Sequence, residues 1–271
     1  MTDTITYREL HNMDELNRVV ELEQAVWDMT PSDTVPAALL ISITGNGGVV
    51  IGAETAAGQL VGFTFGIPAR QDGEWYLWSY SAGVAPGWQD HGIGGGLKAA
   101  QRQWALSHDY QVIRWTFDPM RRANANFNFR RLGVIAERYH INRYGTMTDG
   151  LNAGMQSDRL EVTWKLTDSR VEALLSGQQS PQPAITPDAD QIVLAFEQGQ
   201  LTVGSPQGQP SRLYIEIPPD LAALKHQQLE LAQAWQLAMR DAFLKAFAAG
   251  YHARTMITAA GRYWYELVLN D

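Results

Sequence analysis

The stretch GWQDHGIGGGLKAAQ, residues 87–101, concentrates glycines directly before a helical pattern of apolar residues. The start of a helix exposes backbone N–H groups and carries the positive end of the helix dipole, which together form a ready anion site. Glycines at such a start allow a ligand to approach the bare backbone. The segment therefore predicts a small ligand that carries phosphate.

Two common phosphate loops fit this segment poorly. A P-loop requires Lys and then Ser or Thr after its second glycine, but Ile93 and Gly94 follow Gly92. The dinucleotide fingerprint is a closer rival, because Gly92-Ile93-Gly94 supplies its first half and Asp118 ends the next predicted strand. Against it, Leu97 takes the place of the third glycine and the preceding strands have an antiparallel pattern. A nicotinamide-dependent oxidoreductase stays an alternative.

Composition narrows the classes of partner. The 271 residues are 45% hydrophobic and 18% charged, which is typical of a globular protein. A net charge of -8 disfavours nucleic acid or an anionic membrane as a partner. The absence of cysteine excludes disulfides, zinc thiolate sites and thiol nucleophiles. No targeting segment or membrane-spanning run is evident, so we expect a cytoplasmic protein.

Periodicity predicts a first domain of alternating strands and helices. Asn12 and Glu15 form a capping-box pattern at the start of a helix that runs to about Trp27. Further helices are expected at 36–44, from the glycine segment to Trp104, and at 124–132, with strands at 5–10, 49–53, 60–66, 74–84, 112–117, 135–144 and 160–166.

The second half has a linker and a smaller domain. Residues 167–190 are rich in Ser, Gly, Gln and Pro and are predicted to form a linker. Beyond it we expect strands at 212–217, 251–257 and 263–269, and one long helix capped by Asp220. The predicted domains are therefore 1–168 and 191–271, joined by a linker at 169–190.

The glycine segment and the element order together resemble a known superfamily. Gln89-Asp90-His91-Gly92-Ile93-Gly94 matches Q/R-x-x-G-x-G/A, the acyl-CoA pyrophosphate loop of the GCN5-related N-acetyltransferases (GNAT), over about residues 4–166. A second stretch resembles an uncharacterised GNAT branch with an extra C-terminal domain, through Asp118-Pro119, Asn124-Ala125, Asn128, Leu132-Gly133, Tyr139, Asn142, Tyr144-Gly145 and DGLNAGMQSDRLEVTW at 149–164.

This resemblance implies an α/β (α+β) fold with a mixed, mostly antiparallel sheet and splayed central strands, plus a small C-terminal α/β domain that covers the cleft or builds a homodimer. It implies an acyl-CoA-dependent N-acyltransferase that uses acetyl-CoA, or another short acyl-CoA such as succinyl-CoA, without a metal. The acceptor is expected to be the amine of a small molecule such as an amino acid, acylated directly in a ternary complex. A non-catalytic acyl-CoA-binding module is the alternative.

Several positions are expected at the cofactor. The backbone near Gly83 and Val84 is expected to supply the donor for the oxyanion. Gly96 is expected to let the helix pack closely on a strand, which is a second reading for Gly95. The remaining cofactor-binding candidates are Gln89, Asp90, His91, Gly92, Ile93, Gly94, Gly95, Lys98, Asn124 and Asn128.

The usual general acid is missing. The family commonly has a tyrosine four residues before the glycine of the pair that ends the fourth helix, and that position is Phe129 here. Either the thiolate leaves unaided, which a thiol pKa of about 8.5 permits, or Tyr144 or Tyr139 donates the proton. Glu23, Glu74 and His91 are conceivable bases, and Glu23 is the base candidate at the site.

The loop between residues 149 and 159 is the predicted border of the acceptor site. Arg159 is suited to clamp a carboxylate while an aspartate meets an ammonium group, although Asp158 and Arg159 would equally pair with each other. The substrate-binding candidates are Trp27, Trp78, Asp149, Asn152, Asp158 and Arg159.

Overall fold

The computed structural model describes residues 4–31, 33–145, 154–177, 185–204 and 208–269. The described chain forms two compact units: an N-terminal unit that ends at Trp115, and a C-terminal unit that begins at Thr116. Asp149 and Asn152, both predicted at the acceptor site, lie outside the described residues.

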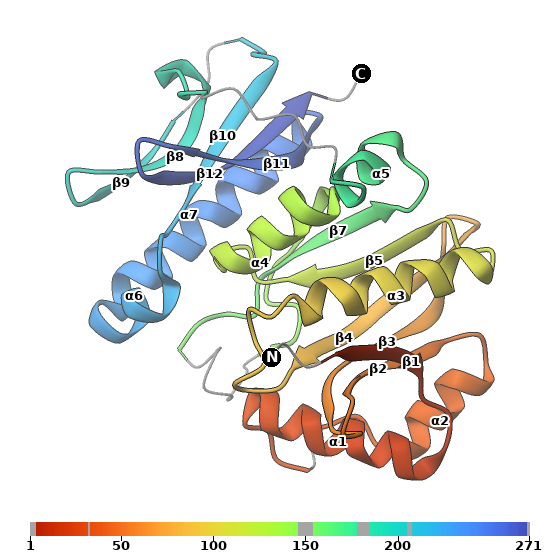
Figure 1. Cartoon of the computed structure of the whole chain (residues 1–271). Helices are drawn as coiled ribbons and strands as arrows, with labels where there is room; N and C mark the ends of the chain where they lie inside the picture. Colours follow the sequence, from red (N-terminus) through yellow and green to blue (C-terminus); the bar gives the residue numbers. More distant parts are fainter. Residues whose placement is uncertain (1–3, 32, 146–153, 178–184, 205–207, 270–271) are drawn as a thin grey trace. The chain divides into compact units, whose positions relative to one another are not determined.

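The N-terminal unit contains the neighbouring strands β1 to β5, with helices on both of their faces (Figure 1). Strands β1 to β4 pair antiparallel in chain order, and β5 joins β4 in parallel. Helices α1 and α2 cover one face and α3 covers the other (Figure 1). The strands are β1 (Ile5–Glu9), β2 (Val49–Thr55), β3 (Leu60–Gln71), β4 (Glu74–Val84) and β5 (Val112–Phe117), and the helices are α1 (Met13–Trp27), α2 (Ala37–Gly45) and α3 (Ile93–Ser107).

The predicted capping box at the start of α1 is confirmed. The Asn12 side chain accepts a hydrogen bond from the Glu15 backbone N–H at 3.0 Å, and the Glu15 carboxylate accepts one from the Asn12 N–H at 3.3 Å. These bonds satisfy two N–H groups that a helix start would otherwise leave unpaired. The helix then buries Leu16, Val19 and Leu22 against the sheet.

The C-terminal unit is built around a second group of strands in the order β7-β6-β11-β12-β10-β8-β9. Neighbours pair antiparallel, except that β8 and β10 are parallel. The strands are β6 (Ile135–His140), β7 (Arg159–Lys165), β8 (Ile192–Glu197), β9 (Gln200–Val203), β10 (Arg212–Ile217), β11 (Tyr251–Ala259) and β12 (Arg262–Leu269). The helices are α4 (Arg122–Asn126), the π-helical turn η1 (Phe127–Leu132), α5 (Ser169–Leu175), the 3₁₀ turn η2 (Ala189–Gln191), α6 (Leu221–Gln227) and α7 (Leu229–Ala248).

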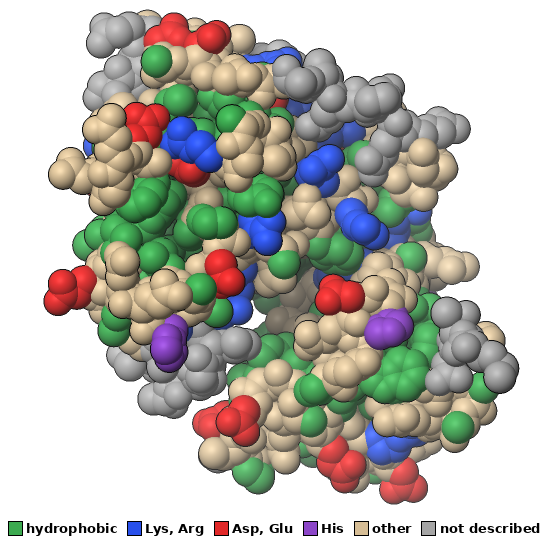
Figure 2. All heavy atoms as spheres, turned by 60° about the vertical axis from the view of Figure 1, so that its left-hand side comes forward, with side chains coloured by type: hydrophobic (Ala, Val, Ile, Leu, Met, Phe, Trp, Pro, Cys, Tyr) green, Lys and Arg blue, Asp and Glu red, His purple; other side chains and the backbone are tan. Residues whose placement is uncertain are grey.

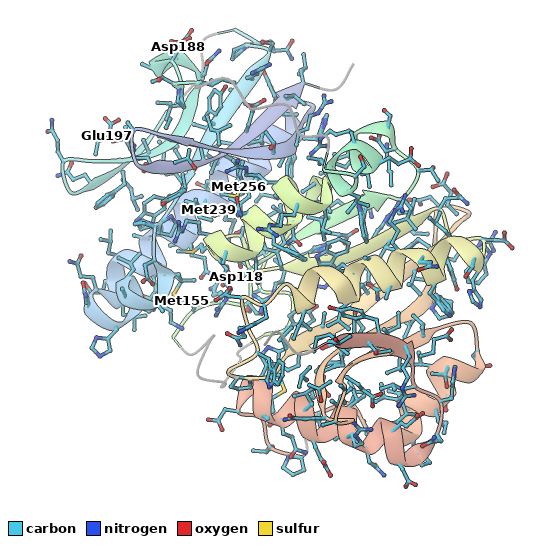
Figure 3. The ribbon with its side chains drawn as sticks, in the orientation of Figure 1. Asp118, Met155, Asp188, Glu197, Met239 and Met256 are labelled. Carbon is cyan, nitrogen blue, oxygen red and sulfur yellow. The ribbon has the colours of Figure 1, made fainter. Side chains whose placement is uncertain are left out.

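Strands from both sides of the predicted linker share this sheet, because Ala136 of β6 pairs with Ala253 of β11. Helix α7 packs on the same strands, and Met239 of α7 and Met256 of β11 are buried in the interior (Figure 3). The mixed, mostly antiparallel architecture confirms the predicted fold class. The predicted domain division at 168 and 190 stays a prediction.

Four local features differ from the expectations. The expected long helix divides at Gln228, whose extended φ of -149° interrupts the helical backbone. Helix α5 forms within the predicted linker because Val171 is buried. Strand β6 ends at His140, before a turn in which Asn142 adopts a left-handed φ of 44°. Strands β8 and β9 were not expected, since the compositional bias of the preceding segment obscures their start.

Among the described residues, no helix combines the length and the apolar character that crossing a bilayer requires. On the face shown in Figure 2, basic and acidic side chains are interspersed.

One buried carboxylate holds the parts of the C-terminal unit together. The Asp158 side chain has no exposed surface and accepts hydrogen bonds from the Tyr139 hydroxyl at 2.9 Å and the Asn142 backbone N–H at 2.9 Å. Arg240 of α7 donates to both carboxylate oxygens, at 2.9 and 3.0 Å. A bidentate charge-assisted pair of this kind links helix α7 to strands β6 and β7.

Replacing the arginine of this pair should destabilise the protein strongly. In Arg240→Met the Asp158 carboxylate stays buried without its counter-charge, so we expect a loss of about 3–5 kcal/mol in the free energy of unfolding, measured by urea denaturation. The double variant Asp158→Asn, Arg240→Met should recover part of that loss. Arg138→Met is the control, because Arg138 is 45% exposed and lies 4.0 Å from Glu161; its cost should stay below about 1 kcal/mol. Equal losses in Arg240→Met and Arg138→Met would contradict the assigned role of the pair.

Candidate functional site

A β-bulge in β4 sets the geometry of the N-terminal unit. Phe65 of β3 faces Ser81 of β4, but its neighbour Gly66 faces Ser79, so Tyr80 is an extra residue in β4. Side chains alternate along a strand, and one extra residue reverses the alternation. Ser79 therefore points to the α3 side, where its hydroxyl contacts Lys98, while Ser81 points to α1 and lies 3.5 Å from the Glu23 carboxylate.

Strands β4 and β5 part immediately before the bulge. In the described chain they pair only at Leu77–Ile113 and Trp78–Arg114. Strand β4 continues to Val84 with its other edge paired to β3. The predicted splaying of the central strands is thereby confirmed for this unit. The remaining edge of β4 presents backbone N–H and C=O groups that no strand of the N-terminal unit takes up.

Helix α3 begins at the predicted glycine loop. Gly92 is its N-cap residue with a left-handed φ of 79°, a conformation that glycine adopts without strain. The first intrahelical bond runs from the Gly96 N–H to the Gly92 carbonyl at 3.1 Å, so the preceding amides have no intrahelical acceptor. A Cβ atom added to Gly92, Gly94 or Gly95 would meet no described atom within 4 Å. The loop therefore offers open space above unpaired N–H groups.

Gly96 has a different reason for lacking a side chain. A Cβ atom at this position would overlap the ring and hydroxyl of Tyr7 on β1. This confirms that Gly96 lets helix α3 pack closely on a strand, whereas Gly95 faces open space and has no such neighbour. Gln89, Asp90 and His91 are exposed, consistent with an accessible loop.

Lys98 differs from its predicted role. Its side chain is buried, and its ammonium donates to the Ser79 hydroxyl at 2.8 Å and to the Gln101 side-chain carbonyl at 3.0 Å. The same ammonium lies 4.1 Å from the centre of the Trp115 ring. An ammonium held in the interior in this way is not free to neutralise a phosphate at the exposed loop.

Glu23 lies on the opposite side of β4. Its carboxylate is buried and accepts a hydrogen bond from the Val35 backbone N–H at 3.0 Å. Burial raises the pKa of Glu23, and the bonds from Val35 and Ser81 only partly oppose that rise. A buried carboxylate with a raised pKa next to a strand bulge is suited to accept a proton.

The aromatic candidates of this unit are half-buried. Trp27 packs edge-on against Phe63 at 5.7 Å, and its ring tip would lie 3.2 Å from a Cβ on Gly83. Gly83 is therefore required for close packing of α1 on β4, beside the half-buried Val84. Trp78 packs edge-on against Tyr76 at 6.5 Å.

In the C-terminal unit, the two tyrosines predicted as general acids differ in exposure: Tyr139 is buried and Tyr144 is exposed. Tyr139 is wrongly placed for a general acid: its hydroxyl is buried against Asp158, and burial and that carboxylate raise its pKa above the ordinary value. Tyr144 is 53% exposed, and its hydroxyl lies 3.1 Å from that of Thr116. Phe129 is fully buried, edge-on to Phe117 and Tyr265, and is a core residue.

Asp158 and Arg159, both predicted at the acceptor site, also have different environments. The Asp158 prediction is wrong, because its carboxylate is fully buried and paired with Arg240. The Arg159 guanidinium donates to the Asp158 backbone carbonyl at 2.8 Å and lies 5.5 Å from the centre of the Tyr144 ring. Asn124 is exposed and Asn128 is buried.

Asp118 belongs to the dinucleotide alternative, as a ribose-binding acid, and to the stretch that resembles the GNAT branch. It lies at the end of β5, before α4 (Figure 3). Burial raises its pKa, while the Met120 N–H and the charges of Arg121, Arg159 and Lys225 oppose the rise. The sequence could not predict that Lys225 lies near Asp118, because the two residues are distant in the chain and only the fold brings them together.

No protein family description and no curated protein sequence matched the chain. The chain is similar in fold to the ribosomal-protein-S18-alanine N-acetyltransferase from Escherichia coli, at 15% identity over 61% of this chain and 96% of that chain, with a TM-score of 0.48. A chain of the NatC complex bound to Gag peptide and CoA is 12% identical over 60% of this chain and 99% of that chain, with a TM-score of 0.48. An aminoglycoside acetyltransferase from an uncultured soil metagenomic sample, in complex with sisomicin, is 19% identical over 46% of this chain and 84% of that chain, with a TM-score of 0.41. At these values the likeness assigns neither a substrate nor a catalytic residue to this chain.

Proposed function

We propose that the chain is an acyl-CoA-dependent N-acyltransferase of the GNAT type. It transfers a short acyl group, acetyl in the simplest case, to the amine of a small molecule in a ternary complex. The observation that carries this proposal is the start of α3, where glycines in open space expose amides without an intrahelical acceptor. It follows the loop after β4, whose edge beyond Trp78 is paired to no strand of the N-terminal unit.

Acyl-CoA matches both features at once. Its pyrophosphate suits the amides and positive dipole end at Gly92 to Gly95. Its pantetheine arm contains two amide groups, which suit the free edge of β4 as an added strand would. From Val84 to Ser79 that edge spans about 17 Å at 3.3 Å per residue. The thioester would thereby arrive at the bulge, between the serines on either face.

Glu23 is the proposed base. The acceptor amine must lose a proton before it attacks the thioester carbonyl, and the buried Glu23 carboxylate reaches Ser81 at the bulge. Within the C-terminal unit, Arg159 keeps its predicted role as the partner of an acceptor carboxylate, because a guanidinium can pair with a carboxylate through two parallel hydrogen bonds. The acceptor proposed on this ground is an amino acid.

A non-catalytic acyl-CoA-binding module is the second candidate, because Phe129 and Tyr139 are both unable to act as the acid. Turnover separates the two. Purified protein is mixed with acetyl-CoA or succinyl-CoA and a panel of amino acids, amines and peptides, and the release of free CoA thiol is measured. Thiol release that depends on one acceptor supports the enzyme. Tight CoA binding without release across the panel supports the binding module.

A charge placed in the glycine loop should abolish CoA binding without harm to the fold. Gly94→Glu adds a side chain where no described atom is near, and an acidic residue in the first turn of a helix is stabilising. We expect an unchanged or higher melting temperature and at least a 100-fold weaker CoA dissociation constant by calorimetry. Gly45→Ala is the control, because its added Cβ is equally unopposed at the end of α2; it should keep wild-type affinity. Wild-type affinity in Gly94→Glu would refute the assignment of the loop.

Removal of the proposed base should lower the rate but not CoA affinity. We expect Glu23→Gln to reduce kcat about 10²–10⁴-fold, because the amide cannot accept the amine proton. In the wild type, kcat should rise with pH through the Glu23 pKa, which lies above its ordinary value of 4.5, since the ionised form is active. Glu21→Gln on the exposed side of α1 should behave like the wild type. A pH profile of Glu23→Gln that keeps this rise would exclude Glu23 as the base.

A further inference from the structure

A buried polar cluster lies where β4 and β5 part. Ser79 and Trp115 are the residues immediately after the last pair between these strands. The Lys98 ammonium bridges them, at 2.8 Å from the Ser79 hydroxyl and 4.1 Å from the centre of the Trp115 ring. Gln101, one turn further along α3, accepts hydrogen bonds from both Lys98 and Ser79 at 3.0 Å. The three polar residues of this cluster, Ser79, Lys98 and Gln101, are each at most 6% exposed.

The cluster has more donors than acceptors. An ammonium brings three N–H donors, an amide two and a hydroxyl one, whereas the acceptors are the Gln101 carbonyl and the Ser79 oxygen. Among the described residues the Gln101 side-chain NH₂ group is buried without a partner. A buried donor without a partner is costly. The cluster is therefore chemically complete only when an electron-rich group joins it.

The burial of the Lys98 ammonium is not explained by an ion pair within the described residues. Titratable side chains of the described residues that pack against α3 include Tyr7, near Gly96, Glu9, which accepts from the Trp104 indole at 3.1 Å, and Tyr110, whose ring centre lies 6.0 Å from that of Trp104. No carboxylate of the described residues forms an ion pair with Lys98. Burial lowers the pKa of Lys98 to about 7. At neutral pH its ammonium is therefore a far better proton donor than an ordinary lysine.

We propose that Ser79, Lys98 and Gln101 receive the negative charge of the departing CoA thiolate, and that Lys98 supplies its proton through the Ser79 hydroxyl. The proposal rests on the proposed function, which brings the thioester to the bulge beside Ser79. It assigns the role left empty by Phe129 to a lysine on α3. Tyr144 becomes the competing donor that the test must exclude.

The proton balance of the step is complete. The neutral amine attacks the thioester carbonyl, and the C–S bond then breaks with its electron pair moving to sulfur. The nitrogen, now bonded to the acyl carbon, releases one proton to solvent as the amide forms. The Ser79 hydroxyl gives its proton to the sulfur and takes one from the Lys98 ammonium, which becomes a neutral amine. Lys98 regains a proton from solvent after the free CoA thiol leaves. No oxidant, reductant or metal takes part.

The test measures the pKa of the CoA thiol itself and needs no acceptor. CoA is bound at saturating concentration, and its thiolate is titrated by ultraviolet absorbance against the desulfo-CoA complex as the blank. In the wild type the pKa of the bound thiol should fall at least about 1 unit below that of free CoA titrated in the same buffer, because an ammonium nearby favours the thiolate. In Lys98→Met it should return to the value of free CoA, and in Ser79→Ala it should lie between the two.

Controls separate the possible failures. Lys165→Met removes an exposed lysine and should match the wild type, as should Tyr144→Phe. Circular dichroism establishes that each variant is folded, and Ser79→Ala provides the test if Lys98→Met is not. An equally lowered thiol pKa in the wild type and in the cluster variants overturns the inference, as does a loss of the shift in Tyr144→Phe alone. Failure of the wild type to bind CoA would instead refute the proposed function, and this inference with it.

Discussion

The N-terminal unit depends on one extra residue in β4. Without the bulge at Tyr80, Ser79 and Ser81 would point to the same face of the sheet, because side chains repeat every second residue. The bulge turns one serine toward α3 and the other toward α1, where they meet an ammonium and a carboxylate, respectively. The bulge lies two residues after Trp78, the last residue of β4 that pairs with β5. A strand edge and two titratable groups on opposite faces thus converge on a few residues.

The same physical cause acts on both titratable groups in opposite directions. Burial without a counter-charge disfavours the ionised form, so it raises the pKa of Glu23 and lowers that of Lys98. Both groups thereby approach the pH range in which they exchange protons readily. Asp158 in the C-terminal unit has a different environment, because its carboxylate accepts two hydrogen bonds from Arg240. A carboxylate paired in this way links the elements that it contacts.

Local sequence patterns predicted the helices and strands well. They could not predict which side chains that are distant in the sequence contact each other. The capping box of α1 and the bounds of β4, β5 and β10 follow from periodicity and turn residues in the sequence itself. The role of Asp158 could not be predicted, because its partner Arg240 is on a helix of the other predicted domain. Lys98 was misjudged for a related reason: proximity to the loop in sequence does not reveal that its side chain points into the interior.

The sequence alone does not tell why each glycine of α3 lacks a side chain, and the structure gives different answers for Gly96 and for Gly94 and Gly95. Each glycine in a helix costs roughly 0.5–1 kcal/mol relative to alanine. At Gly96 close packing against Tyr7 offsets that cost within the protein. At Gly94 and Gly95 no described atom lies where a side chain would be. The proposed function supplies a reason for these two glycines, because the pyrophosphate of acyl-CoA would lie against the amides of that helix start.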